Sequence, residues 1–412
     1  MQFSDVLGQQ PIKDKLVQLV QHNRLSHALL FLGKEGSGAL SLALAFAQYI
    51  VCTSAKEQAV PEGPSLFGSE PVAPTKSNPD LEQTDSCGIC AACQKANKLV
   101  HPDIHFSFPV ITKKSTEAPI SSDYMNEWRE FIASYPYGNV YDWLQSIGAE
   151  NKQGNITKRE CEDINKKLSL KSFESKYKIL IMWLPEYLGK EGNRLLKLIE
   201  EPPPNTIFIF VAQDENVILP TILSRTQLIK IPQLSHLDIE SALVSRAGAN
   251  EKTAKQLSGL AGGNYREALQ LLQHAEEDWQ EVARDWLKFI NRQQIAEQIK
   301  WIDDMSKMGR EKQKQFLLFF IHLLEQAIRL EIIDEDKLSN NEDSSFNISE
   351  MERDFGVRLN KLCSLEAQEA IIDELNKACY YIERNANPKI LFHALSIRLF
   401  YIIKDNSLIL IN

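Results

Sequence analysis

No stretch of this 412-residue sequence approaches the ~18 consecutive apolar residues that a membrane-spanning helix requires. Its first five residues have neither the charged segment nor the apolar segment of a signal peptide. Positive charge is also in deficit, with a formal net charge of −9, so affinity for nucleic acid would have to come from a local basic patch. We therefore expect a cytoplasmic protein without membrane contact, large enough for roughly two to three domains.

Cysteine is scarce, with seven residues in the chain. Three of them form a tight C-x-x-C-x-x-C motif at Cys87, Cys90 and Cys93. Such a cluster indicates metal binding in a reducing compartment rather than disulfides. A closed Zn²⁺ site needs four ligands, and we favour Cys52 as the fourth because a long intervening loop costs little entropy to close. The alternatives are His101 or His105 as the fourth ligand, or a set of small buried thiols without metal.

A glycine-rich loop at Gly33–Leu40 lacks the residues that make such loops catalytic. It follows the apolar run Ala28–Leu32 and precedes a helix-like stretch, which is the order of a phosphate-binding P-loop. Its glycines, which would let backbone N–H groups face phosphate oxygens, are Gly33, Gly36 and Gly38. Where a working loop has Lys followed by Ser or Thr, this chain has Ala39 and Leu40. Without those groups the loop holds neither the outer phosphates nor Mg²⁺, so we expect this chain not to hydrolyse ATP and to bind it weakly or not at all.

The second motif of an ATPase, which should follow a buried strand near residues 178–182, is also degenerate. An active enzyme has carboxylates there to hold Mg²⁺ and to orient water. This chain has Trp183 and Leu184, neither of which can bind a hard cation. Glu186 lies three positions late, and we expect it to be a solvated loop carboxylate. Two motifs have thus lost their chemistry independently.

Two arginines occupy positions from which they could reach a phosphate group. Arg225, beside Ser224, lies at a corner between a helix-like stretch and a strand, from which an arginine can stabilise charge on a neighbouring subunit's phosphate. The alternative is a surface arginine in a turn. Arg266 lies in the first turn of a helix that follows Gly262-Gly263, and it could contact a bound phosphate or could be an exposed helix arginine.

The most basic segment of this acidic chain lies between residues 152 and 178. A helix beginning near Thr157, Lys158 and Arg159 could hold a DNA phosphate at its N-terminus. A charge run is more often a solvated face, and that alternative stays open. Residues 53–86 are rich in Pro, Ser, Gly and Glu and are expected to form a mobile surface insertion.

The hydrophobic pattern changes once along the chain. Apolar strand-like runs alternate with helical segments as far as about Leu234, which predicts a parallel sheet covered by helices on both faces. From there the pattern is wholly helical, with a first block ending near His274 and a second block continuing to the C-terminus. The fold class is therefore α/β followed by all-α.

Taken in order, these motifs resemble those of the clamp-loader branch of the AAA+ ATPases. The residues that carry the resemblance are Phe3–Gln9, Arg24–Phe31, the cysteines at 52, 87, 90 and 93, His101–Asp103, Leu195–Pro203, Ile222–Arg225 and Asn387–Lys389. The match covers most of residues 1–275 and is much weaker over 276–412. The degenerate motifs resemble those of a family member that lacks a working ATP site. Thr226 differs from the cysteine usual in the family.

The resemblance implies a AAA+ core over 1–232 with a zinc module at 52–93, a small helical lid over 233–275, and an all-α collar over 276–412. It also implies a ring of related subunits in which Ser224 and Arg225 complete the ATP site of a neighbour as an arginine finger. The implied partners are the gamma/tau motor and delta subunits of DNA polymerase III, a DNA-directed DNA polymerase and thus a nucleotidyltransferase, together with the sliding clamp and primed DNA. The isolated chain would not be an enzyme.

Two other functions remain open. An active motor subunit of the gamma/tau type is opposed by the missing lysine, hydroxyl and carboxylates, and ATP turnover by the isolated chain would revive it. A zinc-dependent regulatory protein is the other, although four cysteine ligands leave no open position on the metal for catalysis.

Overall fold

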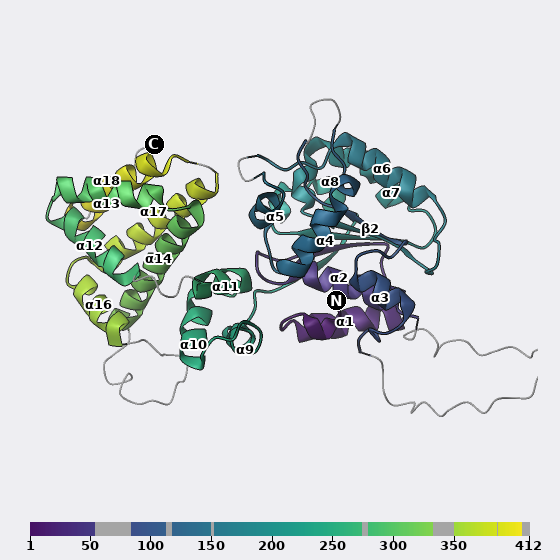
Figure 1. The fold of residues 1–412 in the computed structure, drawn as a ribbon, viewed down its shortest axis with the longest axis horizontal. Helices are drawn as coiled ribbons and strands as arrows, with labels where there is room; N and C mark the ends of the chain where they lie inside the picture. The colour runs from purple at the N-terminus through teal and green to yellow at the C-terminus, as the bar shows by residue number, and fades with distance from the viewer. Residues whose placement is uncertain are drawn as a thin grey trace, which may run out of the picture. The chain divides into compact units, whose positions relative to one another are not determined.

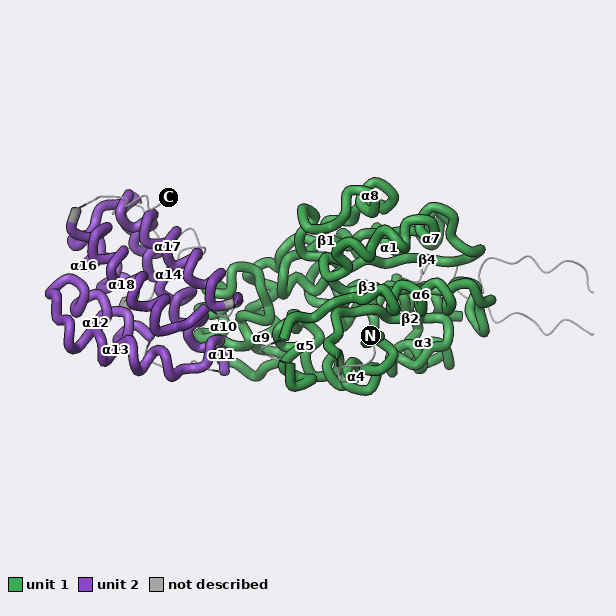
Figure 2. Tube along the Cα trace, turned by 90° about the horizontal axis from the view of Figure 1, so that it is seen from above, with its two compact units in different colours: residues 1–270 green, residues 271–412 purple. Residues whose placement is uncertain are grey.

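The computed structural model describes residues 1–53, 84–112, 118–149, 152–273, 279–332, 350–384 and 386–405. The chain divides into two compact units, Met1–Gln270 and Leu271–Asn412, which Figure 2 distinguishes by colour. Most of the insertion predicted at 53–86 lies outside the described residues. No helix in the described part of the chain is long and apolar enough to cross a membrane.

A five-stranded, wholly parallel sheet forms the centre of the first unit. Its spatial order is β2-β3-β4-β1-β5, and its strands are β1 (Ala28–Leu32), β2 (Ile104–Ser107), β3 (Lys178–Trp183), β4 (Thr206–Ala212) and β5 (Gln227–Lys230). Strands β3 and β4 are buried along their whole length, as expected for a parallel sheet covered on both faces. The predicted parallel sheet with helices is thus confirmed.

Helices cover both faces of this sheet (Figure 1). One face packs against α1 (Gln10–Gln21), α2 (Ala39–Val51), α3 (Ala91–Asn97), α4 (Met125–Ser134) and α5 (Val140–Ser146). The other face packs against α6 (Lys158–Ser169), the 3-10 segment η3 (Pro185–Leu195), α7 (Leu196–Glu200) and α8 (Pro220–Leu223). Because side chains alternate along a strand, neighbouring residues such as Leu29 and Leu30 enter different cores. Short 3-10 turns lie at Phe3–Asp5, Ser121–Tyr124 and Glu215–Val217.

Three helices follow the last strand: α9 (His236–Ala247), α10 (Glu251–Leu260) and α11 (Tyr265–Gln273). The boundary between the two units falls within α11. Ser235 and Asn250 cap α9 and α10 by accepting backbone N–H groups in the first turn. Gly248 ends α9 in a left-handed conformation at φ 71°. These helices occupy the range predicted for a lid, 233–275, and residues up to Gln270 belong to the same compact unit as the sheet.

The second unit is helical, as its sequence pattern predicts. Its helices are α12 (Trp279–Asn291), α13 (Ile295–Lys307), α14 (Arg310–Ile332), α16 (Glu350–Asn360), α17 (Leu365–Glu383) and α18 (Pro388–Asp405). The stacked indoles of Trp286 and Trp301, with centroids 4.7 Å apart, lie in its core beside Phe316. This unit has its own continuous apolar core.

Candidate functional site

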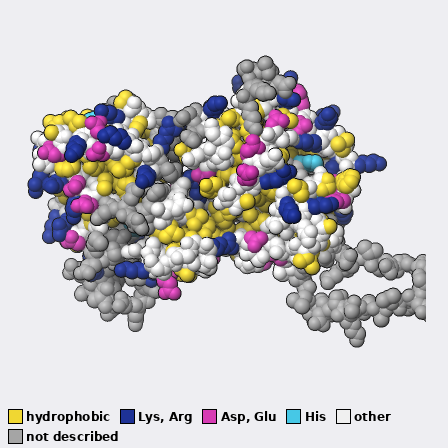
Figure 3. Space-filling model, viewed as in Figure 1, with side chains coloured by type: hydrophobic (Ala, Val, Ile, Leu, Met, Phe, Trp, Pro, Cys, Tyr) yellow, Lys and Arg dark blue, Asp and Glu magenta, His cyan; other side chains and the backbone are white. Residues whose placement is uncertain are grey.

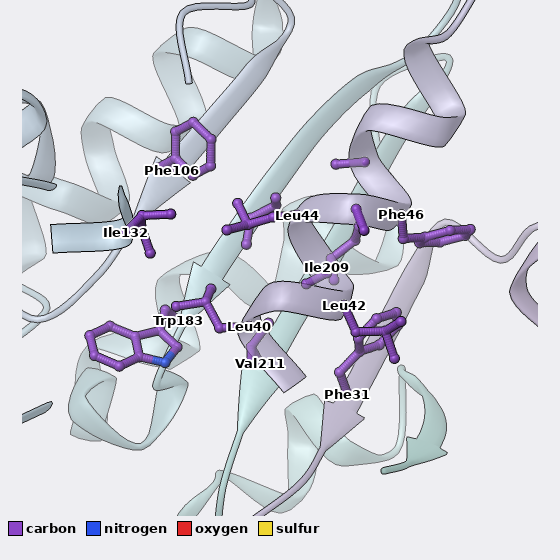
Figure 4. Packing of buried hydrophobic residues seen from close by; sticks show 14 of the residues in the cluster. Phe31, Leu40, Leu42, Leu44, Phe46, Phe106, Ile132, Trp183, Ile209 and Val211 are labelled. Atoms are coloured by element: carbon purple, nitrogen blue, oxygen red, sulfur yellow. The ribbon is translucent and has the colours of Figure 1, made fainter. Parts of the chain in front are cut away.

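The glycine-rich loop lies where the sequence places it, between β1 and α2. Gly36 and Gly38 adopt left-handed conformations at φ 69° and 83°, and α2 begins directly after Gly38. The two positions that should carry catalytic groups point into the core, because Ala39 and Leu40 are only 7% and 6% exposed. Leu40 lies among the apolar side chains of the sheet face that α2 covers (Figure 4).

The pocket beside this loop is small. The pocket lined by the loop, by residues 136–138 and by the ends of β3 and β4 has a volume of about 30 Å³. Sites for small molecules and cofactors usually measure about 300–1,000 Å³. The pocket is therefore smaller than a usual cofactor site.

Trp183, at the end of β3, stands where an ATPase would carry acidic residues. Its indole packs against Trp128 and Phe131 of α4, at centroid distances of 5.2 and 5.9 Å. Glu186 is not the solvated carboxylate that the sequence predicts. Its Oε1 accepts hydrogen bonds from the N–H groups of Gln213 at 2.6 Å and Asp214 at 3.0 Å, and burial raises its pKa. This carboxylate fixes the loop after β4, an interaction from 27 residues away that a local pattern does not reveal.

Arg225 lies at the predicted corner, directly after α8 and before β5. Its Nε donates to Oε1 of Glu200 at 2.5 Å, and its Nη1 donates to the carbonyl oxygen of Thr221 at 2.8 Å. Nη1 also donates to Oγ of Ser224 at 3.2 Å. The side chain remains 35% exposed. The corner therefore holds the guanidinium in a defined position at the surface.

One of the two placements that the sequence left open for Arg266 is wrong. Arg266 is buried, and its guanidinium makes a bidentate ion pair with Asp142: Nε lies 2.5 Å from Oδ2 and Nη2 lies 2.7 Å from Oδ1. The carboxylate of Asp142 thus lies against the guanidinium. Arg266 is not an exposed helix arginine.

The three DNA candidates lie together at the start of α6. Thr157 caps the helix through Oγ1, which accepts from Glu160 N–H and donates to the carbonyl oxygen of Pro119. Arg159 donates to the carbonyl oxygen of Ala118, whereas the Lys158 ammonium is exposed and lies 3.5 Å from Glu162. On the face seen in Figure 3, Lys and Arg side chains are scattered among acidic ones and form no single patch.

The four predicted cysteines come together. The Sγ atoms of Cys52, Cys87, Cys90 and Cys93 all lie within 4.8 Å of one another. A tetrahedral Zn²⁺ site with Zn–S bonds of about 2.3 Å has sulfur atoms about 3.8 Å apart, and Sγ of Cys87 lies 3.9 Å from that of Cys93. Among the described residues, the cluster contains neither His101 nor His105. The donor set and spacing fit zinc.

Backbone geometry supports thiolates at this cluster. Cys52 ends α2, Cys90 caps α3, and N–H groups of Cys87, Cys90 and Cys93 each donate to a cysteine sulfur at 3.4 Å. Burial opposes ionisation of Cys90, but hydrogen bonds from Thr53 and Cys93 outweigh it and lower its pKa to about 6. Burial raises the pKa of Cys93, and a bound cation would favour its thiolate instead.

Sequence reasoning missed the segment that packs beside the glycine-rich loop. Tyr137, Asn139 and Asp142 all contact the loop or α11, although none was a candidate. Two signals were available: the turn-forming residues at 135–139, and the capping box in which Asn139 and Asp142 accept each other's N–H groups. Both signals predict a turn and a helix start, and neither predicts what they touch.

A glycine-rich loop between the first strand of a parallel sheet and a buried helix is the arrangement of a P-loop-type domain, here with Ala39 and Leu40 after the last glycine. A model of the family "DNA polymerase III, delta subunit" matches residues 8–66 and 74–235, which is more than half of the chain. The chain therefore belongs to this family of clamp-loader subunits.

One relative in particular agrees with this assignment. DNA polymerase III subunit delta' of Bacillus subtilis is 23% identical over 334 residues, covering 78% of each chain, which confirms the resemblance to clamp-loader subunits. The gamma/tau subunit of Mycobacterium tuberculosis H37Rv is 26% identical over 225 residues, covering 54% of this chain and 27% of the relative. A gamma-subunit-related protein from Thermotoga maritima aligns over 93% of this chain and 98% of its own, with 13% identity and a TM-score of 0.34.

Proposed function

We propose that this chain is a non-hydrolysing clamp-loader subunit of the delta prime type, acting in DNA replication. The observation that carries the proposal is the occupation of both ATPase motifs by buried apolar side chains. Leu40 and Trp183 line the same pocket of about 30 Å³, so the motif positions that would hold Mg²⁺ and the outer phosphates carry apolar side chains. ATP used by the ring is then bound by its motor subunits.

Arg225 is the residue through which this chain would act on a neighbour. Its guanidinium is fixed at an exposed corner, from which it would stabilise charge on the transferring phosphate in an adjacent gamma/tau site. Ser224 supports it through the hydrogen bond at Oγ. The partners are the gamma/tau and delta subunits and, through the assembled ring, the sliding clamp and primed DNA. The second unit would join the collar of this ring in the cytoplasm.

The four cysteines would hold one structural Zn²⁺. When bound, the ion cross-links the end of α2 to α3 through four thiolates and leaves no open coordination position. Cys52 ends α2, and Cys90 and Cys93 lie at the start of α3. At α6, Lys158 is the candidate for a DNA phosphate, because its ammonium is exposed beside Glu162, whereas Thr157 and Arg159 donate to backbone carbonyl oxygens.

Replacement of Arg225 in the assembled ring tests the proposal. Arg225→Ala should leave the chain folded and the ring assembled, and should lower ATP turnover at one motor site by several powers of ten. Arg225→Lys should not restore turnover, because lysine lacks the planar fork of donors. ATPase and clamp-loading rates of rings built with each variant are the measurement. Unchanged rates with Arg225→Ala would show that the turn containing Arg225 plays no part in ATP turnover.

The alternatives make different predictions for the isolated chain. A gamma/tau-type motor would turn over ATP by itself, and that turnover would be lost when the loop at Gly33–Leu40 is mutated. A zinc-dependent regulator would show a metal-dependent activity without ring partners. Steady phosphate release by the pure chain would therefore overturn the proposal.

A further inference from the structure

The turn between α4 and α5 occupies the corner beside the glycine-rich loop. Pro136, Tyr137 and Gly138 line the small pocket together with the loop and with Trp183. This turn belongs to the chain segment between β2 and β3, which lies far from the loop in sequence. The loop is therefore contacted by a distant part of its own chain.

Tyr137 links three parts of the first unit. Its hydroxyl accepts a hydrogen bond from the N–H of Leu7 at 2.8 Å. Its ring lies against the loop so closely that a Cβ added at Gly38 would be 2.9 Å from Cε1. On its other side the ring makes an edge contact with Tyr265 of α11, at a centroid distance of 5.1 Å. Burial raises the pKa of Tyr137 to about 12, so the hydroxyl stays neutral in this corner.

Asp142 supplies the negative charge opposite Arg266. The pair is bidentate, and the two side chains are 12% and 5% exposed. Charge-assisted bidentate pairs of this kind are among the stronger hydrogen-bonded contacts in proteins. Asn139 adds a contact to the loop, because its Nδ2 donates to Oε2 of Glu35 at 3.1 Å.

The start of α11 closes over the loop directly. The N–H of Tyr265 points to the carbonyl oxygen of Gly36 at 3.4 Å, and a Cβ added at Gly36 would lie 1.8 Å from Oδ1 of Asn264. A glycine is therefore required at this position by the close approach of α11 as well as by its φ of 69°. The loop and the start of α11 are therefore in direct contact at Gly36.

Aromatic packing anchors the segment that carries these residues. Trp128 of α4 stacks on Phe108 at 4.1 Å and contacts Trp143 of α5 at 5.2 Å. Trp143 also donates from Nε1 to the carbonyl oxygen of Pro109 at 2.7 Å. Trp183 completes the cluster by packing on Trp128. Trp183, which lies in the second motif, thus supplies part of the surface against which α4 packs.

We propose that residues 135–142 are an internal substitute for nucleotide, which joins helices α9–α11 to the sheet without ATP. The inference deepens the proposed function, since a subunit with a permanently filled corner would keep one lid position while its motor neighbours change theirs. It also gives the degenerate motifs a structural role, because Leu40 and Trp183 line the pocket beside this segment. In place of a bound ligand, the glycine-rich loop contacts residues 135–142 of its own chain.

Hydrogen exchange of backbone amides in the full chain, with and without millimolar MgATP, tests this inference. Wild-type exchange in α9–α11 should be the same in both conditions. Arg266→Gln should speed exchange in α9–α11 about tenfold or more, because Asp142 loses its buried partner. Asp142→Asn should do the same, and it additionally weakens the cap of α5, whereas Arg266→Gln leaves that cap intact. Asp354→Asn, which breaks an exposed ion pair with Arg358, is the matched control and should change nothing.

Two results would overturn the inference. One is unchanged exchange in α9–α11 for Arg266→Gln while the variant remains folded by circular dichroism. The other is protection of α9–α11 in the wild type when MgATP is added. Either result would refute the internal substitute and leave the role of Arg225 intact. Loss of the Arg225 effect in rings would refute the proposed function and leave the filled corner intact.

Discussion

Glu200 and Arg225 form an ion pair that fixes the guanidinium at the corner after α8. Oε1 of Glu200 accepts from Nε of Arg225 at 2.5 Å, while Nη1 is used by Thr221 and Ser224. The pair is partly exposed, with side chains 44% and 35% accessible, so it contributes little to stability. Its effect is positional: the plane of the guanidinium is set before any neighbour arrives.

Glu200→Ala should therefore lower ATP turnover of the assembled ring without unfolding the chain. A guanidinium that must be oriented anew loses preorganisation, and we expect a loss of about tenfold, smaller than that of Arg225→Ala. Glu200→Gln should lie near the wild type because its carbonyl oxygen can still accept from Nε. Glu191→Ala, which removes a similar surface partner from Arg194, is the control. Faster turnover in Glu200→Ala would show that Glu200 restrains Arg225 instead.

The fold could be predicted because its signals are local. Continuous apolar runs such as Ile207–Ala212 predict buried parallel strands, and glycines between a strand and a helix predict the loop. The cysteine cluster could be predicted because three ligands lie within seven residues and the fourth is joined by a long segment, whose closure entropy grows slowly with length.

The polar contacts around the glycine-rich loop could not be predicted in the same way. Asp142 and Arg266 lie 124 residues apart, and nothing in either local sequence specifies the pairing. Glu186 was misjudged for a related reason, since its partners are backbone N–H groups, which carry no sequence signature. Apolar packing patterns reveal which residues are buried, whereas long-range polar pairs depend on the completed fold.

Restoring the loop lysine should not restore an ATPase. Ala39 is 7% exposed and belongs to the core beside α2, so Ala39→Lys would bury a charge without a partner and lower the melting temperature. Mg²⁺ would still lack ligands at Trp183 and Leu184. Phosphate release at background level together with reduced thermal stability is the expected result. Sustained turnover by Ala39→Lys would mean that the space beside the glycine-rich loop can open to nucleotide.

One zinc ion should bind per chain at the four-cysteine cluster. Cys90→Ser should release the metal, because serine oxygen is a poor replacement for a thiolate ligand, and should loosen α3 against the end of α2. Cys161→Ser is the control, since Cys161 is buried away from the cluster and contacts the carbonyl oxygen of Glu191. Metal analysis of the three proteins is the measurement. Equal zinc in the Cys90 variant and the wild type would exclude this site.

Asp103 should stabilise the fold in a pH-dependent way. Its carboxylate accepts backbone N–H groups from Phe173 at 2.5 Å, Glu174 at 2.8 Å and Ser175 at 2.7 Å. Burial alone would raise its pKa, but these three hydrogen bonds outweigh it and hold the pKa below the ordinary 3.8. The bonds fix a loop that presents Phe173 with 83% of its surface exposed.

A depressed pKa in the folded state means that the fold favours the carboxylate. The stability from Asp103 is then fully present above pH 3.8 and is lost as the pH falls through the lower folded value. Asp103→Asn should cost about 1–3 kcal/mol at neutral pH, because an amide satisfies fewer of the three N–H groups. The difference from wild type should shrink below pH 3.8. Urea unfolding at neutral and acid pH measures it, with Asp14→Asn at an exposed site on α1 as the control. A difference that stays constant with pH would show that Asp103 acts by shape alone.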